Sequence, residues 1–281
     1  MRWTDEGRSS DLEDRRGSSG FGGTGIGLPH IGIGGAIFLL LLSLIFHRNF
    51  FALLGGDSGT ASVAQSRPVD DPAEEKEVHF ISFVFDDVQH TWETTFEQQG
   101  RPYRHAKLVL FRNAIDSACG MAQSATGPFY CPEDEKVYID LSFYDELKQR
   151  FGAPGDFAQA YVLAHEIGHH IQKLLGTEGQ VEQLMSTHPG ERNQLSVKLE
   201  LQADCFAGIW AHSTQQRNLL EAGDAEEAMR AAAAVGDDRL QKMETGRVNP
   251  ETFTHGTSEQ RTHWFNQGME SGQINACNTF Q

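Results

Sequence analysis

The chain has 281 residues, which suits one sizeable catalytic domain with appendages or two small domains. Its hydrophobic content of 39% and charged content of 22% are ordinary for a globular protein with polar tails. The formal net charge of −16 argues against a nucleic-acid partner, which would require a basic stripe. We assign most of this acidity to a solvated surface, so it says nothing about the substrate. The four cysteines show no CxxC spacing, which disfavours a zinc ribbon.

The amino-terminal quarter of the chain predicts a membrane anchor. Residues 1–27 are rich in Gly, Ser and charged residues, and this composition predicts a disordered arm. Residues 28–47 are predicted to form a transmembrane helix, because Leu28–Phe46 contains no Lys, Arg, Asp or Glu and is long enough to cross a bilayer. A buried core helix is the alternative, but the segment has no amphipathic face. No small-residue cleavage site follows, which favours an uncleaved anchor over a signal peptide.

Positive charges around this segment predict its orientation. Four arginines precede the span, whereas only His47 and Arg48 follow it closely. The positive-inside rule therefore places the arm in the cytoplasm. The predicted localisation is the inner membrane with a single span, and with the large domain on the periplasmic or extracellular side. Residues 48–76 form a predicted linker, and residues 77–281 form the predicted catalytic domain.

The first part of the domain predicts one helix and two strands. Val78–Gln98 has apolar residues at spacings of three and four, typical of an amphipathic helix that Gly100 ends. Lys107–Phe111 is a predicted short strand. Lys136–Leu141 alternates apolar and polar residues and is predicted to be a strand lining a substrate cleft, with a free edge for an extended peptide. An ordinary internal sheet strand is the alternative.

The cysteines suggest two cross-links in an exported domain. Cys119 and Cys131 bracket a glycine-containing loop, and a bridge between them would contribute roughly 3 kcal/mol on chain-entropy grounds. A bridge between Cys205 and Cys277 would hold the carboxyl-terminal tail against a predicted helix. In the cytosol, all four would instead be free thiols.

The segment Ala158–Leu175 carries the motif on which the functional prediction depends. His165, Glu166 and His169 form an HExxH pattern. Residues i and i+4 share one face of a helix, so the two imidazoles can bind one metal ion while Glu166 takes a proton from a bound water. Two solvated histidines around a helical glutamate are the alternative, since such a short pattern also arises by chance.

A second predicted helix, Asn193–Ser213, supplies a carboxylate pair. Glu200 and Asp204 share one face of this helix. A catalytic zinc site requires a third protein ligand, and a carboxylate on the outer nitrogen of a ligating histidine. Glu200 fits the first role and Asp204 the second. Two surface charges are the alternative, but their neighbours are apolar nearly all round the helix, and carboxylates in such surroundings need partners.

The remaining segments contribute weaker candidates. Gly176–Gly190 is a predicted loop, and Ala225–Met243 is a predicted helical region interrupted at Gly236 and packed on the outside. A last helix begins at Thr257 or Ser258.

Two residues near the start of this last helix are candidates for the site. His255 is predicted to donate a hydrogen bond to the oxyanion formed during peptide hydrolysis, and Arg261 to pair with an acidic site residue. Helix capping and a surface charge are the respective alternatives.

Five long stretches of the sequence are specific enough to carry a resemblance, namely MRWTDEGRSSDLEDRRG, GPFYCPEDEKVYIDLSFYDEL, FGAPGDFAQAYVLAHEIGHHIQ, LELQADCFAGIWAH and THGTSEQRTHWF. With them, the chain resembles the bacterial family of neutral zinc metallopeptidases. The family is similar to thermolysin-like zincins, so the resemblance implies that His165, His169 and Glu200 bind zinc and that Glu166 is the base. His255 with Arg261 is also similar to a segment of membrane-bound CAAX-prenyl-type proteases, although Gly256 replaces their proline.

The prediction is therefore a mostly helical α+β, zincin-like domain with a small β-sheet, preceded by one transmembrane helix. It binds one Zn²⁺ ion and hydrolyses peptide bonds in a peptide or protein substrate as an endopeptidase. A non-catalytic zinc-binding scaffold is the main alternative, although ligation alone does not require Glu166. A cell-wall amidase is a third possibility, and the oligomeric state stays open.

Overall fold

The computed structural model describes residues 1–17, 71–123, 127–153 and 155–280. Within these ranges, no helix combines the length and the hydrophobicity needed to cross a membrane. The predicted transmembrane helix and nearly all of the predicted linker lie outside the described residues. Met1–Gly20 and Pro72–Gln281 belong to one folded unit.

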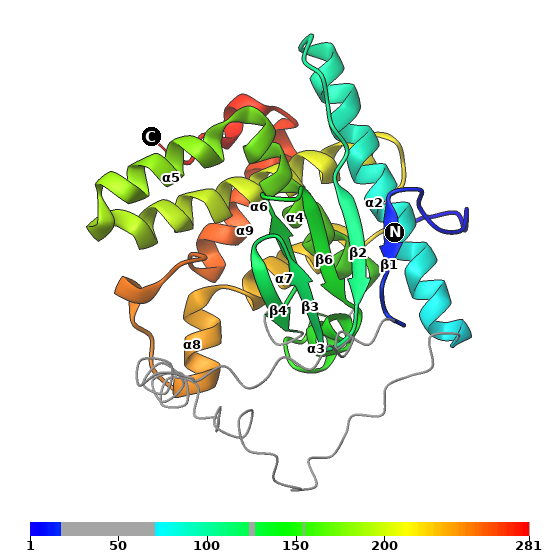
Figure 1. Cartoon of the computed structure of the whole chain (residues 1–281), viewed down its shortest axis with the longest axis horizontal. Coiled ribbons are helices and arrows are strands. Elements are labelled where there is room, and N and C mark those ends of the chain that lie inside the picture. The colour runs from blue at the N-terminus through cyan, green and yellow to red at the C-terminus, as the bar shows by residue number, and fades with distance from the viewer. Residues whose placement is uncertain (18–70, 124–126, 154, 281) are drawn as a thin grey trace, which may run out of the picture. The chain divides into compact units, whose positions relative to one another are not determined.

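A four-stranded sheet with the order β1-β2-β6-β5 lies at the centre of this unit (Figure 1). The strands are β1 (Leu12–Asp14), β2 (Lys107–Phe111), β5 (Phe129–Cys131) and β6 (Lys136–Asp140). The pairs β1–β2 and β2–β6 are parallel, whereas β5 runs antiparallel to β6. A separate hairpin joins β3 (Ala114–Ser117) to β4 (Gly120–Gln123).

Alternation along the strands gives the sheet two buried faces, because successive side chains point to opposite sides. Leu108 and Leu110 of β2 belong to the main core, which they share with helical residues. Val109 and Phe111 point the other way, into a smaller cluster on which Ile115 of the β3–β4 hairpin packs. The sheet is thus covered on both faces, which suits its continuous apolar strands.

Helices make up most of the unit. They are α2 (Pro72–Gln98), α3 (Ser142–Gln149), α4 (Asp156–Leu175), α5 (Thr177–Thr187), α6 (Arg192–Gln216), α7 (Asp224–Ala234), α8 (Asp237–Thr245) and α9 (Ser258–Ser271), with short 3₁₀ turns η3 (Pro189–Glu191), η4 (Pro250–Thr252) and η5 (Ile274–Cys277). The mostly helical α+β class is therefore confirmed. The zincin fold itself stays a prediction.

Glycines allow three of these helices to approach closely. A Cβ on Gly168 of α4 would lie 2.9 Å from the backbone oxygen of Ala203 in α6. A Cβ on Gly208 of α6 or on Gly268 of α9 would collide with the backbone of the facing helix. These contacts hold α4, which carries the HExxH motif, and α9 closely against α6, which carries Glu200 and Asp204. The candidate site requires this arrangement.

The predicted disordered arm is wrong for residues 1–17. Leu12–Asp14 forms β1, whose residues pair with Leu108–Leu110 of β2. Arg8 and Arg16, which entered the orientation prediction as free positive charges, are instead bound by carboxylates of the folded unit. Arg16 Nη1 lies 2.7 Å from Glu74 Oε1, and Arg8 Nε lies 2.6 Å from Glu75 Oε1.

This pairing restricts how the chain can meet a membrane. Residues 1–17 and 72–280 belong to one sheet and one core, so they lie on the same side of any bilayer. A single crossing between them would separate β1 from β2. The predicted arrangement with a cytoplasmic arm and an external domain would require this strand pair to be broken.

Three further corrections concern single elements. The predicted strand at Lys136–Leu141 is confirmed as β6, but it lies between β2 and β5, so it has no free edge and β5 is the edge strand on that side. The predicted loop at Gly176–Gly190 is mostly helix, as α5. The helical region after Ala225 is confirmed as α7 and α8, but α7 does not pack only on the outside, since Ala228, Ala231 and Ala232 are fully buried.

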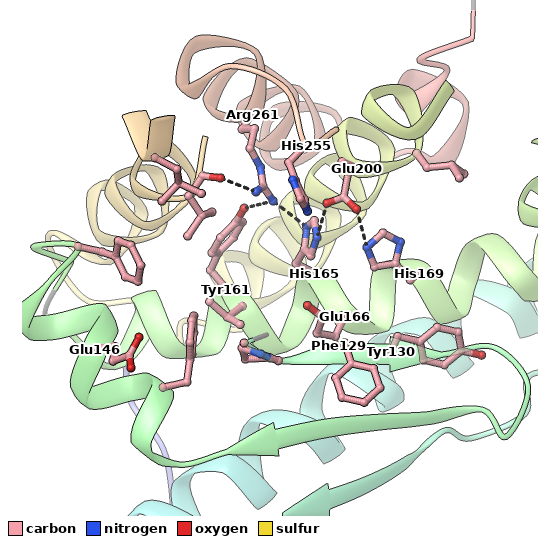
Figure 2. A pocket seen from close by; sticks show the side chains of 18 of the residues that line it. Phe129, Tyr130, Glu146, Tyr161, His165, Glu166, His169, Glu200, His255 and Arg261 are labelled. Atoms are coloured by element: carbon pink, nitrogen blue, oxygen red, sulfur yellow. Dashed lines mark hydrogen bonds and ion pairs between the residues drawn. The ribbon is translucent and has the colours of Figure 1, made fainter. Parts of the chain in front are cut away.

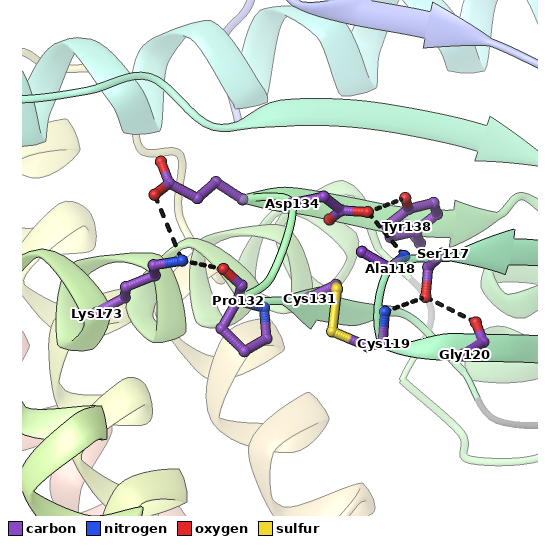
Figure 3. Close-up of a disulfide and its surroundings, with 10 residues drawn as sticks. Ser117, Ala118, Cys119, Gly120, Cys131, Pro132, Asp134, Tyr138 and Lys173 are labelled. Atoms are coloured by element: carbon purple, nitrogen blue, oxygen red, sulfur yellow. Dashed lines mark hydrogen bonds and ion pairs between the residues drawn. A yellow bond between two sulfur atoms is a disulfide. The ribbon is translucent and has the colours of Figure 1, made fainter.

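Both expected disulfides are present. Cys119–Cys131 joins the turn of the β3–β4 hairpin to the end of β5 (Figure 3). Cys205–Cys277 joins α6 to η5 near the carboxyl terminus. Among the described residues no cysteine is free. The segment between Cys119 and Cys131 is more regular than expected, since it contains β4 and most of β5.

Candidate metal centre and cleft

A cleft of about 580 Å³ opens between α4, β5, α3, α6 and the chain before α9 (Figure 2). His165, Glu166 and His169 of α4 line it, as do Glu200 of α6 and His255. Apolar side chains line the part near α3, among them Phe143, Phe151, Val162 and Leu240. The cleft therefore combines one polar cluster with a larger apolar wall, as small-ligand and substrate sites commonly do.

Two imidazoles and one carboxylate converge in this cleft. Ligand atoms of His165, His169 and Glu200 all lie within 4.8 Å of one another. His165 Nε2 is 3.2 Å from Glu200 Oε2, and His169 Nε2 is 3.6 Å from Glu200 Oε1. The convergence of Glu200 with the two histidines, predicted from helical spacing in two separate segments, is thus present.

The charges of the histidines and carboxylates in this cluster shift one another's pKa values. Burial alone would lower the pKa of His165, but the Asp204 and Glu200 carboxylates outweigh it and raise that pKa to about 10. Burial would raise the pKa of Glu200, but His169, His165 and His255 outweigh it and lower that pKa. The carboxylate is therefore ionised at neutral pH and provides a negative charge for a cation.

The outer nitrogen of His165 binds a buried carboxylate, as predicted for Asp204. His165 Nδ1–H donates to Asp204 Oδ1 at 2.9 Å, and Tyr161 Oη donates to the same oxygen at 2.5 Å. Arg261 donates from Nε to Asp204 Oδ2 at 2.8 Å and from Nη2 to Oδ1 at 2.9 Å. Arg261 is 3% exposed and Asp204 is fully buried, so this bidentate pair neutralises a charge that would otherwise be costly to bury.

The donor set fits a catalytic zinc ion. Two ligands on a tetrahedral zinc at about 2.1 Å are separated by roughly 3.4 Å. The two nitrogen-to-oxygen distances of 3.2 and 3.6 Å bracket this value. Both Nδ1 atoms are already bound to other side chains, which leaves the two Nε2 atoms for the metal. Two imidazoles and one carboxylate are the protein ligands of open hydrolytic zinc sites, in which water takes the fourth position.

Glu166 lies beside this cluster without being part of it. It is 8% exposed and lines the cleft one residue after His165. Figure 2 shows Glu166 between His165 and Phe129. Its place next to the predicted water position suits a base rather than a ligand.

His255 reaches the cleft with its own carboxylate partner. His255 Nδ1–H donates to Asp237 Oδ1 at 3.2 Å, while Asp237 Oδ2 accepts from the backbone N–H groups of Thr254, His255 and Gly256 at 2.6 to 3.0 Å. The hydrogen bond to Asp237 raises the pKa of His255, as does the charge of Glu200, against the opposing effect of burial. Figure 2 shows His255 beside Glu200 and His165.

The edge strand β5 borders the cleft opposite the metal cluster. Phe129 and Tyr130 line the cleft, and β5 pairs only with β6, which leaves its other edge unpaired within the described sheet. Tyr130 Oη donates to His170 Nδ1 at 2.9 Å, and His170 Nε2–H donates to the Arg104 carbonyl at 2.7 Å. His170 therefore connects the edge strand β5 to the metal-binding helix α4.

Sequence reasoning missed three polar residues around the site, namely Asp237, Gln172 and Gln202. Asp237 binds His255, Gln172 binds His169, and Gln202 binds Gln172. A local signal existed only for Gln172, which lies three residues after His169 and hence on the same face of α4. The partners of the other two are distant in the sequence.

Comparisons with known proteins agree with the chemistry of this cluster. The family model described as "Putative neutral zinc metallopeptidase" matches residues 1–280. The chain is similar to the uncharacterized protein YpfJ of Escherichia coli, with 50% identity over 286 residues that cover 100% of this chain and 99% of that protein. It is also similar to the uncharacterized protein Mb2605 of Mycobacterium bovis, with 42% identity over 204 residues that cover 69% of this chain and 67% of that protein. No solved structure matches the chain. The chain therefore belongs to the neutral zinc metallopeptidase family, whose cofactor is zinc.

Proposed function

We propose that the protein is a zinc-dependent endopeptidase with His165, His169 and Glu200 as zinc ligands and Glu166 as the general base. The observation that carries this proposal is the convergence of these three ligand side chains in a cleft that Glu166 also lines. An idle zinc scaffold would need only the ligands. The presence of a buried carboxylate beside the ligands favours hydrolysis.

The residues of the cleft have distinct tasks. A bound zinc ion lowers the pKa of its water towards 7 and polarises the scissile carbonyl. Glu166 accepts the proton of the attacking water and passes it to the leaving amine. The protonated His255 imidazole donates a hydrogen bond to the oxyanion that develops on the carbonyl, and Asp237 holds the ring in place.

An extended peptide fits the edge of β5. Its backbone can add to the sheet beside Phe129–Cys131 and thereby lie along the cleft, with main-chain hydrogen bonds that do not depend on sequence. Pairing of this kind holds residues on both sides of the scissile bond, which supports cleavage within a chain. The apolar wall near α3 would accommodate a hydrophobic side chain.

The test compares the wild-type protein with Glu166→Gln on casein and on a peptide library, with and without a chelator. We expect the wild type to cleave and to lose activity when zinc is removed. Glu166→Gln should lose at least about a thousandfold in kcat while its zinc content stays at one ion per chain. Zinc binding without cleavage of any peptide by the wild type would favour the scaffold. Release of whole stem peptides from purified cell wall, without cleavage of casein or library peptides, would favour an amidase. A Glu166→Gln variant with full activity would refute the assignment of the base.

We also propose that the folded domain resides in an oxidising compartment, the periplasm or the cell exterior. Two disulfides join segments that border the site, and such bonds persist outside the cytosol. Residues 1–17 accompany the domain, because β1 belongs to its sheet. This proposal replaces the single-span arrangement predicted from positive charges.

A further inference from the structure

The second imidazole of the metal cluster has a neutral partner. His169 Nδ1 lies 2.9 Å from Gln172 Oε1, whereas the corresponding nitrogen of His165 faces the Asp204 carboxylate. Gln172 is 1% exposed, so its amide lies in the core and not in solvent. A buried amide needs partners for both ends, and those partners determine which end faces His169.

A backbone carbonyl fixes the orientation of the Gln172 amide. Gln172 Nε2 donates to the Leu199 carbonyl at 2.7 Å. A carbonyl can only accept, so the nitrogen of this amide must lie on that side and the oxygen must face His169. The amide oxygen also only accepts, so the proton of the neutral His169 ring is on Nδ1. The lone pair of Nε2 then points towards the Glu200 side of the cluster.

A second amide extends this chain to the carboxyl-terminal tail. Gln172 Nε2 also donates to Gln202 Oε1 at 3.2 Å, and Gln202 Nε2 donates to the Cys277 carbonyl at 3.0 Å. The hydrogen bonds of both amides run in a consistent direction, because the nitrogen of each amide donates to a backbone carbonyl. Gln202 is 8% exposed, so this second amide is also buried.

The tail that carries the last carbonyl is held at two points. Cys277 is fully buried and is bonded to Cys205 of α6, one residue after Asp204. Thr279 Oγ1 donates to the Lys198 carbonyl at 2.7 Å. The tail thus lies against α6, the same helix that supplies Glu200 to the cluster.

We propose that Gln172 and Gln202 are positioning residues for the zinc ligand His169. The tail, held by the Cys205–Cys277 disulfide, keeps their amide groups in this orientation. Gln172 selects the tautomer that leaves Nε2 free for the metal. Gln202 and the Cys277 carbonyl keep Gln172 from turning its amide over. The inference rests on the zinc-binding part of the proposed function and is independent of whether the bound zinc hydrolyses peptides.

The test measures zinc affinity by competition with a chromophoric chelator in the full chain. Gln172→Met keeps the length of the side chain and removes both amide groups, and we expect zinc to bind about 10- to 100-fold more weakly. Gln202→Met should weaken zinc binding by a smaller factor, because Leu199 still orients Gln172. Gln98→Met, at an exposed position of α2, is the matched control and should leave the affinity unchanged.

A second measurement separates positioning from general stability. In ¹⁵N spectra of the metal-free protein with a neutral His169 ring, we expect the Nδ1–H tautomer in the wild type and a mixture of tautomers in Gln172→Met. Variants at Cys205 and Cys277, changed together to Ser, should weaken zinc binding, whereas the same change at Cys119 and Cys131 should not. If the tail variant fails to fold, Gln202→Met tests the same link with the disulfide intact.

The inference fails if Gln172→Met binds zinc as tightly as the wild type, even when its melting temperature falls, since that result would show a purely structural role. It also fails if the wild-type spectrum shows His169 protonated at Nε2 in its neutral form. Neither result bears on peptide cleavage. Conversely, a wild-type protein that binds zinc but cleaves nothing would refute the proposed function and leave this inference standing.

Discussion

Individual side chains determine when the proposed chemistry can operate, and His255 is the clearest case. Neutral His255 donates its Nδ1 proton to Asp237, so it offers a second N–H to a substrate only when it is protonated. Asp237 raises the pKa of His255 above its ordinary value of 6.5. The protonated form is therefore present below that raised pKa and is lost as the pH rises through it.

We expect His255→Phe to lower kcat by about 10²- to 10³-fold, with little effect on zinc content, because the donor to the oxyanion is lost. His255→Gln should recover part of this loss, since its amide also donates. The pH profile of kcat gives the decisive measurement. We expect the activity of the wild type to fall on the alkaline side and that of His255→Gln not to fall there. An alkaline fall that persists in His255→Gln would mean that another group causes it.

Local periodicity explains why the metal ligands could be predicted from the sequence, whereas the residues that hydrogen-bond to the site from other segments could not. His165 and His169 are one helical turn apart, as are Glu200 and Asp204, so a single helix fixes each pair. Asp237 binds a residue 18 positions away, and Gln202 reaches a carbonyl 75 positions away. Such contacts depend on how helices pack, which no spacing within one segment reveals.

Among the elements, β1 shows how a short polar strand escapes sequence analysis. Its three residues, Leu-Glu-Asp, have neither a β-branched residue nor an apolar alternation, and its pairing partner begins 96 residues later. Its attachment depends on charges as well as on the sheet. Arg16 lowers the pKa of Asp14, and Arg8 lowers the pKa of Glu75.

These lowered pKa values predict how the arm comes away in acid. Folding lowers the pKa of such a carboxylate, so the ionised group stabilises the native state at pH values above its unfolded pKa, which is 3.8 for Asp. This stabilisation is lost as the pH falls through the lower pKa of the folded state. We expect hydrogen exchange of residues 1–17 to accelerate below about pH 4, before the rest of the domain opens. Simultaneous exchange of the whole domain would contradict separate release of the arm.

Arg16→Met should release the arm already at neutral pH, because it removes a buried cation from Asp14 and Glu74 at a cost of about 3 kcal/mol. Arg2→Met is the control, since the Arg2 side chain is 66% exposed and its nearest carboxylate lies 3.9 Å away. Hydrogen exchange of Leu12–Asp14 compares the two variants directly. Equal protection in both would mean that the backbone pairing alone holds β1.

For the whole molecule, the shared sheet makes a prediction about sidedness. All four native cysteines are in disulfides, so a single introduced cysteine can be labelled selectively. Ser10→Cys lies in the amino-terminal arm and Ser186→Cys lies in α5, and both positions are exposed. We expect a maleimide that cannot cross the inner membrane to label both variants in cells whose outer membrane is permeabilised and whose inner membrane is intact.

Labelling of Ser186→Cys alone would place the arm across the membrane from the domain and would contradict the pairing of β1 with β2. Labelling of neither, with both reactive after lysis, would place the whole domain in the cytoplasm and refute the proposed compartment. Bulk composition excluded a nucleic-acid partner but could not reveal this constraint. The orientation prediction from the charges around residues 28–47 counted Arg8 and Arg16 as free, whereas carboxylates of the folded domain bind both of them.

The pairing of β1 with β2 also has a consequence for the order of folding. Leu12 must wait for Leu108 to be synthesised, and the parallel partner strand needs β6 beside it to be stable. Closing so long a loop early would cost entropy without an immediate gain, and contacts of high sequence separation form slowly. We therefore expect the helices and the β2–β6 pair to assemble first, with the strand that leaves the ribosome earliest joining the finished sheet at its edge last.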